Sequence, residues 1–231
     1  MNPTRIADLL HPFLDHHLSD AQLGHISTYI DLLLRWNARI NLTAIRDPEE
    51  VVTRHFGESF FAASCLFPTV VEPDARASAI DAATARRQGN AAPGASPAVI
   101  DFGSGAGFPG LPIKIWAPHI HLTLIESHQK KATFLREIAR ALTLTDVNVF
   151  SARAEGFPEG QGTVVTLRAV ERFDRALPDA ARLLAPSGRL ALLISRAQLT
   201  RAHELLPDFV WQDPRPIPLS TSRILALASR P

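Results

Sequence analysis

Apolar and polar residues alternate with two different periods along the chain. In the first 70 residues the apolar positions recur every three or four residues, which is the spacing of one helix face. The pattern predicts a helix over Ala21–Ala38, capped by Asp20. Its apolar face would be formed by Leu23, Ile26, Ile30, Leu33 and Leu34.

A second helix signal is the run Asp47-Pro48-Glu49-Glu50. Asp47 can cap a helix, Pro48 suits the first helical position, and Glu50 is placed to complete a capping box. We therefore expect a helix that starts at Pro48 and runs to about Leu66.

From Ala98 onward the pattern changes to short apolar runs separated by turns and amphipathic segments. Strands are expected at Val99–Phe102, Leu122–Glu126, Val147–Ser151, Val164–Arg168 and Leu190–Ile194. Helices are expected at Leu111–Trp116, Gln129–Leu142, Phe173–Leu184 and Leu199–Leu206. This alternation predicts a mostly parallel sheet with helices on both faces. Phe209–Trp211 and Arg223–Ala228 would add an antiparallel edge, which makes seven strands.

The segment Pro73–Pro97 is rich in Ala, Arg, Gly and Pro and poor in large apolar residues. We interpret it as an insertion, with a fragment of helix around Ala75–Arg87. The chain then divides into a helical N-terminal extension (1–72), this insertion or linker (73–97) and an α/β core (98–231).

Composition narrows the classes of function. The net charge of the 231 residues is +1, so an RNA partner would have to be bound by a local basic patch. Cys65 is the only cysteine, and the N-terminal residues lack an apolar signal core, so we expect a cytoplasmic protein that does not span a membrane. His11, His16 and His17 have no carboxylate or cysteine at metal-ligand spacing, so no metal site is predicted.

The most informative segment runs from Asp101 to Gly110, where a strand ends in a glycine-rich turn. Gly105–Gly110 matches the dinucleotide fingerprint Gly-x-Gly-x-x-Gly, but the match begins two residues late. Pro109 and Pro112 also remove N–H donors that a pyrophosphate needs. S-Adenosylmethionine has no phosphate, so we predict that Gly103 and Gly105 bind this cofactor. A dinucleotide site and a turn that binds nothing are the alternatives.

Charged residues follow the next predicted strand. Glu126 lies about 20 residues after the glycine turn, where a carboxylate can bind the ribose hydroxyls of a nucleoside. The alternative is a solvated acid at the end of a strand. Lys130, Lys131 and Arg136 make the start of the next helix basic, which indicates either RNA contacts or an ordinary charged surface.

These blocks together resemble the bacterial 16S (small-subunit) ribosomal RNA guanine-N7 methyltransferase family, also called glucose-inhibited division protein B. The resemblance is carried by the glycine turn and by Trp36-Asn37, Asn41-Leu42-Thr43, Arg46-Asp47-Pro48-Glu49-Glu50, Arg54-His55, Lys130-Lys131, Phe134-Leu135, Arg153-Ala154-Glu155 and Arg168-Ala169. The chain departs from the family at its long insertion and at Ile194-Ser195-Arg196, where members typically have Lys-Gly.

The resemblance implies a class I methyltransferase, a Rossmann-like α/β fold with a helical N-terminal extension. It implies methyl transfer from S-adenosylmethionine to N7 of a specific guanine in 16S ribosomal RNA, either free or in the small ribosomal subunit. Cofactor contacts would be made by Gly103, Phe108, Ala154, Glu155 and Arg168. His55 and Arg196 join the RNA candidates, and we expect a monomer without a protein partner.

No catalytic residue is predicted, because guanine N7 has a free lone pair and the reaction is mainly a matter of orientation. Three other functions stay open: an NAD-dependent oxidoreductase, a non-catalytic RNA- or ribosome-binding protein, and a small-molecule methyltransferase. Binding of S-adenosylhomocysteine but not of NAD would separate a methyltransferase from the oxidoreductase.

Overall fold

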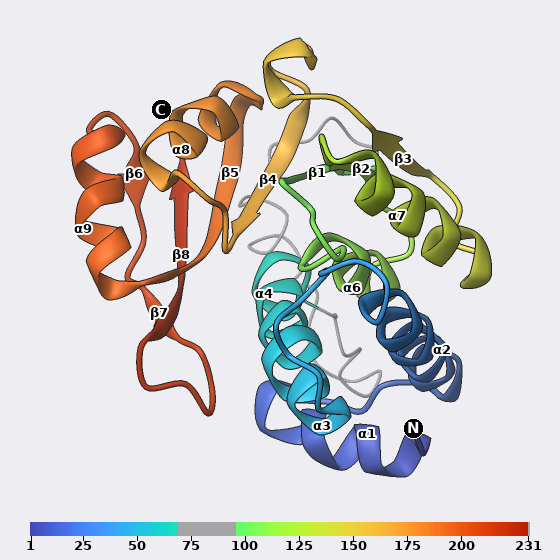
Figure 1. Ribbon diagram of the computed structural model, residues 1–231. Helices are drawn as coiled ribbons and strands as arrows, with labels where there is room; N and C mark the ends of the chain where they lie inside the picture. The colour runs from blue at the N-terminus through green and yellow to red at the C-terminus, as the bar shows by residue number, and fades with distance from the viewer. Residues whose placement is uncertain (69–95, 231) are drawn as a thin grey trace, which may run out of the picture.

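A mixed sheet forms the centre of the computed structural model, which describes residues 1–68 and 96–230 (Figure 1). Within these residues the sheet has eight strands in the order β3-β2-β1-β4-β5-β8-β6, and β7 also pairs with β8. The strands are β1 (Ala98–Phe102), β2 (His121–Ile125), β3 (Val147–Phe150), β4 (Gly162–Arg168), β5 (Leu184–Ser195), β6 (Val210–Trp211), β7 (Arg215–Pro216) and β8 (Arg223–Ser229).

The strands β1 to β5 are parallel and β8 is antiparallel to β5, as the sequence predicts. The predicted number of seven strands is wrong by one. The additional strand, β7, is only the dipeptide Arg215–Pro216, which is too short to show a period of two.

Helices connect and cover the strands. They are α1 (Pro3–Leu10), α2 (Asp20–Asn37), α3 (Pro48–Val51), α4 (Glu58–Leu66), α6 (Gly110–Trp116), α7 (Gln129–Ala141), α8 (Phe173–Arg182) and α9 (Arg196–Leu205). Short 3₁₀ turns are η1 (His11–Phe13) and η3 (Ala154–Gly156), and η2 (Val52–Gly57) is a π-helical segment. The helix expected around Ala75–Arg87 lies outside the described residues.

Two local predictions about helix starts need correction. The cap of α2 is Ser19, which forms a capping box with Gln22, and Asp20 is already helical. Asp47 does cap α3, but the side chain of Glu50 pairs with Arg54 rather than completing a capping box. Ser19 Oγ accepts the Gln22 amide at 3.3 Å, and Arg54 donates to the Glu50 carboxylate at 3.3 Å.

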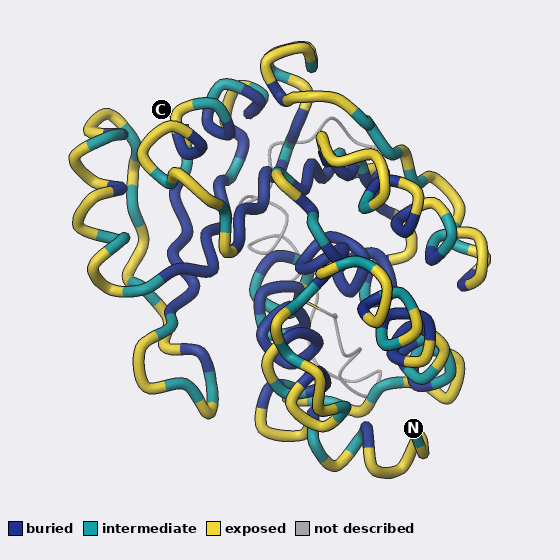
Figure 2. The backbone as a smooth tube through the Cα atoms, in the orientation of Figure 1, coloured by how far each residue is buried: buried dark blue, intermediate teal, exposed yellow. Residues whose placement is uncertain are grey.

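Alternate residues of each strand pack on opposite faces of the sheet. Val99, Leu122 and Leu193 join a core with the N-terminal helices, α6 and α7. Ile100 and Leu192 join a second core with α8 and α9. Figure 2 shows the resulting dark-blue interior between exposed loops. The helical extension is therefore part of the same core as one sheet face and stands beside the carboxyl ends of the strands.

Candidate functional site at the carboxyl edge of the sheet

The glycine turn between β1 and α6 is held by a buried carboxylate. Asp101 is 1% exposed, accepts a hydrogen bond from Thr166 Oγ1 at 2.7 Å, and accepts another from the Gly110 amide at 3.3 Å. Burial raises the pKa of Asp101 to about 6, against the effect of these hydrogen bonds. Asp101 thus fixes the turn, in which Gly103 and Gly105 have φ angles of +67° and +55°.

Glu126 follows β2 directly and faces the turn. One carboxylate oxygen accepts the Gly105 amide at 2.9 Å, and the other accepts the His128 amide at 2.7 Å. The residue is 8% exposed. Each oxygen keeps a further lone pair, so a fixed carboxylate is available to hydroxyl groups of a ligand.

Two cavities meet at this edge and share Phe102, Gly103, Glu126 and Glu171. We call their union the cleft. The smaller cavity extends along β2, η3 and the start of α8, and its lining includes Ala154 and Glu155. The larger one extends toward the N-terminal helices, and its lining includes Gly105, Phe108, Lys131, Arg168 and His55. All seven predicted cofactor residues therefore line one cleft.

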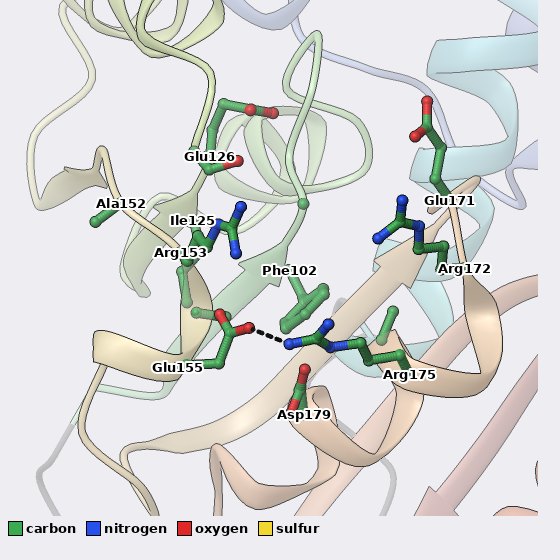
Figure 3. Close-up of a pocket in the computed structure, with 14 residues that line it drawn as sticks. Phe102, Ile125, Glu126, Ala152, Arg153, Glu155, Glu171, Arg172, Arg175 and Asp179 are labelled. Carbon is green, nitrogen blue, oxygen red and sulfur yellow. Dashed lines mark hydrogen bonds and ion pairs between the residues drawn. The ribbon is translucent and has the colours of Figure 1, made fainter.

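The smaller cavity is crossed by an ion pair. Figure 3 shows Arg175 of α8 pointing across the cavity to Glu155 of η3, and the two side chains are 3.2 Å apart. Hydrogen bonding and the nearby arginines lower the pKa of Glu155. Arg153 and Arg172 also surround this end of the cleft. Sequence reasoning did not include Arg175, because no local signal links it to Glu155.

Phe108 forms one wall of the larger cavity and lies between two rings. It stacks on Tyr29 with ring centroids 5.2 Å apart and on His55 at 4.7 Å. The Tyr29 hydroxyl donates to the Ala106 carbonyl within the glycine turn. The N-terminal extension therefore shapes the cleft directly through α2 and η2.

His55 is 8% exposed, and its Nε2 lies 2.8 Å from Thr43 Oγ1. Its Nδ1 is buried without a hydrogen-bond partner in the described residues. Burial, together with Arg168 and Arg223, lowers the pKa of His55 to about 3. The ring is therefore neutral at pH 7.

Arg168 ends β4 and is bound to the N-terminal extension. Its guanidinium donates to Glu58 Oε2 at 3.0 Å and to the Arg54 carbonyl at 2.8 Å. Arg223 donates to the same Glu58 oxygen at 2.5 Å, and Arg54 lies 3.8 Å from the other oxygen. Glu58 is 2% exposed, so Arg168 is paired with a carboxylate inside the protein. Sequence reasoning missed Glu58, although it is only three residues from His55.

Of the remaining RNA candidates, one lines the cleft and three do not. Lys131 lines it, whereas Lys130 and Arg136 are exposed on α7 and do not. Arg196 is exposed at the first position of α9, also outside the cleft lining.

Comparison with known proteins shows the family of the chain. The model of the GidB family, rRNA small subunit methyltransferase G, matches residues 22–71 and 83–209. The chain belongs to this family. A family protein named ribosomal RNA small subunit methyltransferase G from Exiguobacterium is 41% identical over 161 residues, which are 68% of this chain and 57% of that protein. The protein of that name from Listeria monocytogenes is 34% identical over 186 residues, 78% of this chain and 67% of its own length.

A third relative, from Alkaliphilus metalliredigens, is 37% identical over 62% of this chain. The matched region spans about half of that relative, 49%. Solved structures with similar folds include a SAM-dependent methyltransferase from Aquifex aeolicus (14% identity, TM-score 0.49, 64% of this chain and 88% of that chain). Another is a predicted O-methyltransferase from Agrobacterium tumefaciens (22% identity, TM-score 0.48, 58% of this chain and 73% of that chain).

In the part of the chain that the structure covers, no helix combines the length and apolarity that a membrane span requires. The same residues contain no group of three His, Cys, Asp or Glu side chains arranged to hold a metal ion.

Proposed function

We propose that the chain transfers a methyl group from S-adenosylmethionine to N7 of a specific guanine in 16S ribosomal RNA. Family membership supports the reaction class. The structural observation that carries the proposal is the single cleft that joins the glycine turn, Glu126 and η3 at the carboxyl edge of the sheet. Ligands of open α/β sheets bind at this edge.

The cleft residues fit the proposed methyl donor. Gly103 has a φ of +67°, and a Cβ there would lie 3.2 Å from Val170, so a side chain at this position would crowd the floor of the cleft. Glu126 would accept the ribose hydroxyls, and the Ala154-Glu155 segment would contact the adenine. The donor supplies an activated methyl group on a sulfonium sulfur.

The chain's own task is then orientation and control of charge. Guanine N7 has a free lone pair, so no side chain has to remove a proton before attack. The methylated base gains a positive charge. The neutral ring of His55 would add no positive charge beside that base, and Arg168 would be held by the Glu58 carboxylate.

Methylation of ribosomal RNA tests the proposal. Full-length protein and labelled S-adenosylmethionine are incubated with small subunits, and separately with free 16S RNA, from a strain that lacks this modification. We expect one new N7-methylguanine, mapped by chemical cleavage at that base. Absence of labelled guanine with both substrates would contradict the proposal.

The cofactor residues are tested separately by calorimetry with S-adenosylhomocysteine. Gly103→Val and Glu155→Ala should weaken binding, whereas Glu159→Ala should not, because Glu159 is 71% exposed and outside the cleft lining. NAD should not bind the wild-type protein. Equal affinities for all three variants would show that the cofactor site is elsewhere, and binding of NAD would favour an oxidoreductase.

A further inference from the structure

A third cavity lies beside the cleft, between η2 and the loop that precedes β8. Its polar lining consists of Thr53, Arg54, Ser220, Thr221, Ser222 and Arg223, with Glu58 at its base. Thr221 and Ser222 are exposed, and the Arg54 side chain is 49% exposed. The cavity therefore offers hydroxyl and guanidinium donors to a ligand from solution.

The charges around this cavity are unbalanced toward positive. Arg54, Arg168 and Arg223 surround the Glu58 carboxylate. Glu50 is a second carboxylate, paired with Arg54 at 3.3 Å. Three cations therefore face two carboxylates, which leaves a net charge of +1.

In the described part of the chain, Arg54 and Arg223 have side-chain N–H groups that make no hydrogen bond. Among the described residues, the Arg223 side chain uses Nη1 on Glu58, and the Arg54 side chain makes one hydrogen bond, from Nη1 to Glu50. A guanidinium has more N–H groups than these bonds use. Buried Glu58 holds the arginines in place, so little side-chain entropy is lost when they bind an anion.

The cavity opens at the same sheet edge as the cleft. Arg168 ends β4 and lines the cleft, and Arg223 lies opposite Ser195, where β5 ends. Arg168 and Arg223 donate to the same oxygen of Glu58. A polynucleotide with one base in the cleft would therefore bring its neighbouring phosphates close to this cavity.

We infer that this cavity binds backbone phosphates of the RNA substrate. The inference rests on the proposed function, which requires an RNA strand at the cleft. Arginine and hydroxyl donors are the groups that proteins use for phosphate oxygens, and such contacts fix the register of a nucleic acid without reading its sequence. The site would hold the strand while the cleft holds the base.

The test uses the double variant Arg54→Gln/Thr221→Glu, which leaves Arg168 and Arg223 on Glu58. Filter binding of 16S ribosomal RNA is measured from low to high KCl. We expect affinity to fall about tenfold and the slope of log affinity against log salt to decrease by about 1. Binding of S-adenosylhomocysteine should be unchanged, because neither residue lines the cleft.

The control is Arg201→Gln/Gln161→Glu, which makes the same change in charge at exposed residues on α9 and just before β4. Thermal unfolding checks that all variants are folded. The inference is overturned if wild type binds and methylates RNA and the Arg54→Gln/Thr221→Glu variant binds the RNA as tightly as the Arg201→Gln/Gln161→Glu control does. If wild type binds and methylates neither free 16S RNA nor small subunits, the proposed function itself fails.

Discussion

At the scale of single residues, several side chains that look functional in the sequence are also structural. Asp101 lies near the carboxyl end of β1, where a carboxylate could bind a ligand, yet both of its oxygens accept hydrogen bonds from the protein. Phe108 lines the cleft but is held between Tyr29 and His55. The shape of the cleft therefore depends on buried contacts that also stabilise the fold.

Gly107 tests how tightly the turn is packed. Its φ is +90°, and a Cβ would overlap the Tyr29 hydroxyl and Leu111. We expect Gly107→Ala to lower the free energy of unfolding by about 3 kcal/mol. Gly24→Ala is the control, because no atom lies within 4 Å of the new Cβ in α2. Urea unfolding should show a gain of about 0.5–1 kcal/mol for the control; equal losses would contradict this packing.

His55 should make stability depend on pH. Its pKa is about 3 in the folded chain against 6.5 for the free side chain, so the unfolded chain binds the extra proton between these values. Stability from this group is complete above pH 6.5 and is lost as the pH falls toward 3. Relative to His55→Gln, wild type should lose about 1 kcal/mol per pH unit between pH 6 and 4.

Urea unfolding at several pH values measures this difference. The pKa of Asp101 is raised to about 6, so its effect on stability has the opposite sign in the same range. Asp101 is present in both proteins, and the comparison therefore isolates His55. A difference that does not change with pH would show that His55 is not held neutral.

At the scale of elements, the helix from Pro48 to Leu66 joins the extension to the sheet. It was predicted as one helix, but the π-helical turn η2 within it was not. This turn contains Arg54 and His55, and α4 begins with Glu58. A π-helical turn often marks a functional position, because it shifts the side chains that follow it around the helix.

Glu58 is the residue that fastens this helix to β4 and β8. Glu58→Gln removes the carboxylate that Arg168 and Arg223 share, and we expect it to lower the free energy of unfolding by about 3 kcal/mol. Glu49→Gln is the matched control on α3, because the Glu49–Arg5 pair is half exposed and should matter little. Equal stability of the two variants in urea would contradict this role.

At the scale of the whole molecule, the extension and one sheet face share a core that runs from Ile6 to Leu227. The proposed regions 1–72 and 98–231 should therefore unfold together. We expect the transitions in urea followed by far-UV circular dichroism and by tryptophan fluorescence to coincide. Trp36 and Trp116 both lie against this core. Two separated transitions would show that the extension is an independent unit.

From Ala98 onward the sequence by itself determined the alternation of strands and helices, the mostly parallel sheet and the glycine turn, because these depend on periodicity and on turn residues close in the chain. It also indicated the seven cofactor candidates, since loops at the carboxyl edge of a parallel sheet converge. The strand β7 and the Ser19 cap were missed because their signals are short or ambiguous.

Only the tertiary structure decided which charges meet. Arg168 and Arg223 reach Glu58 across 110 and 165 positions of sequence. The tertiary structure alone also decided the neutrality of His55, the stack of Tyr29 on Phe108 and the cavity before β8. Burial and pairing between distant residues set these properties, and no local pattern contains them.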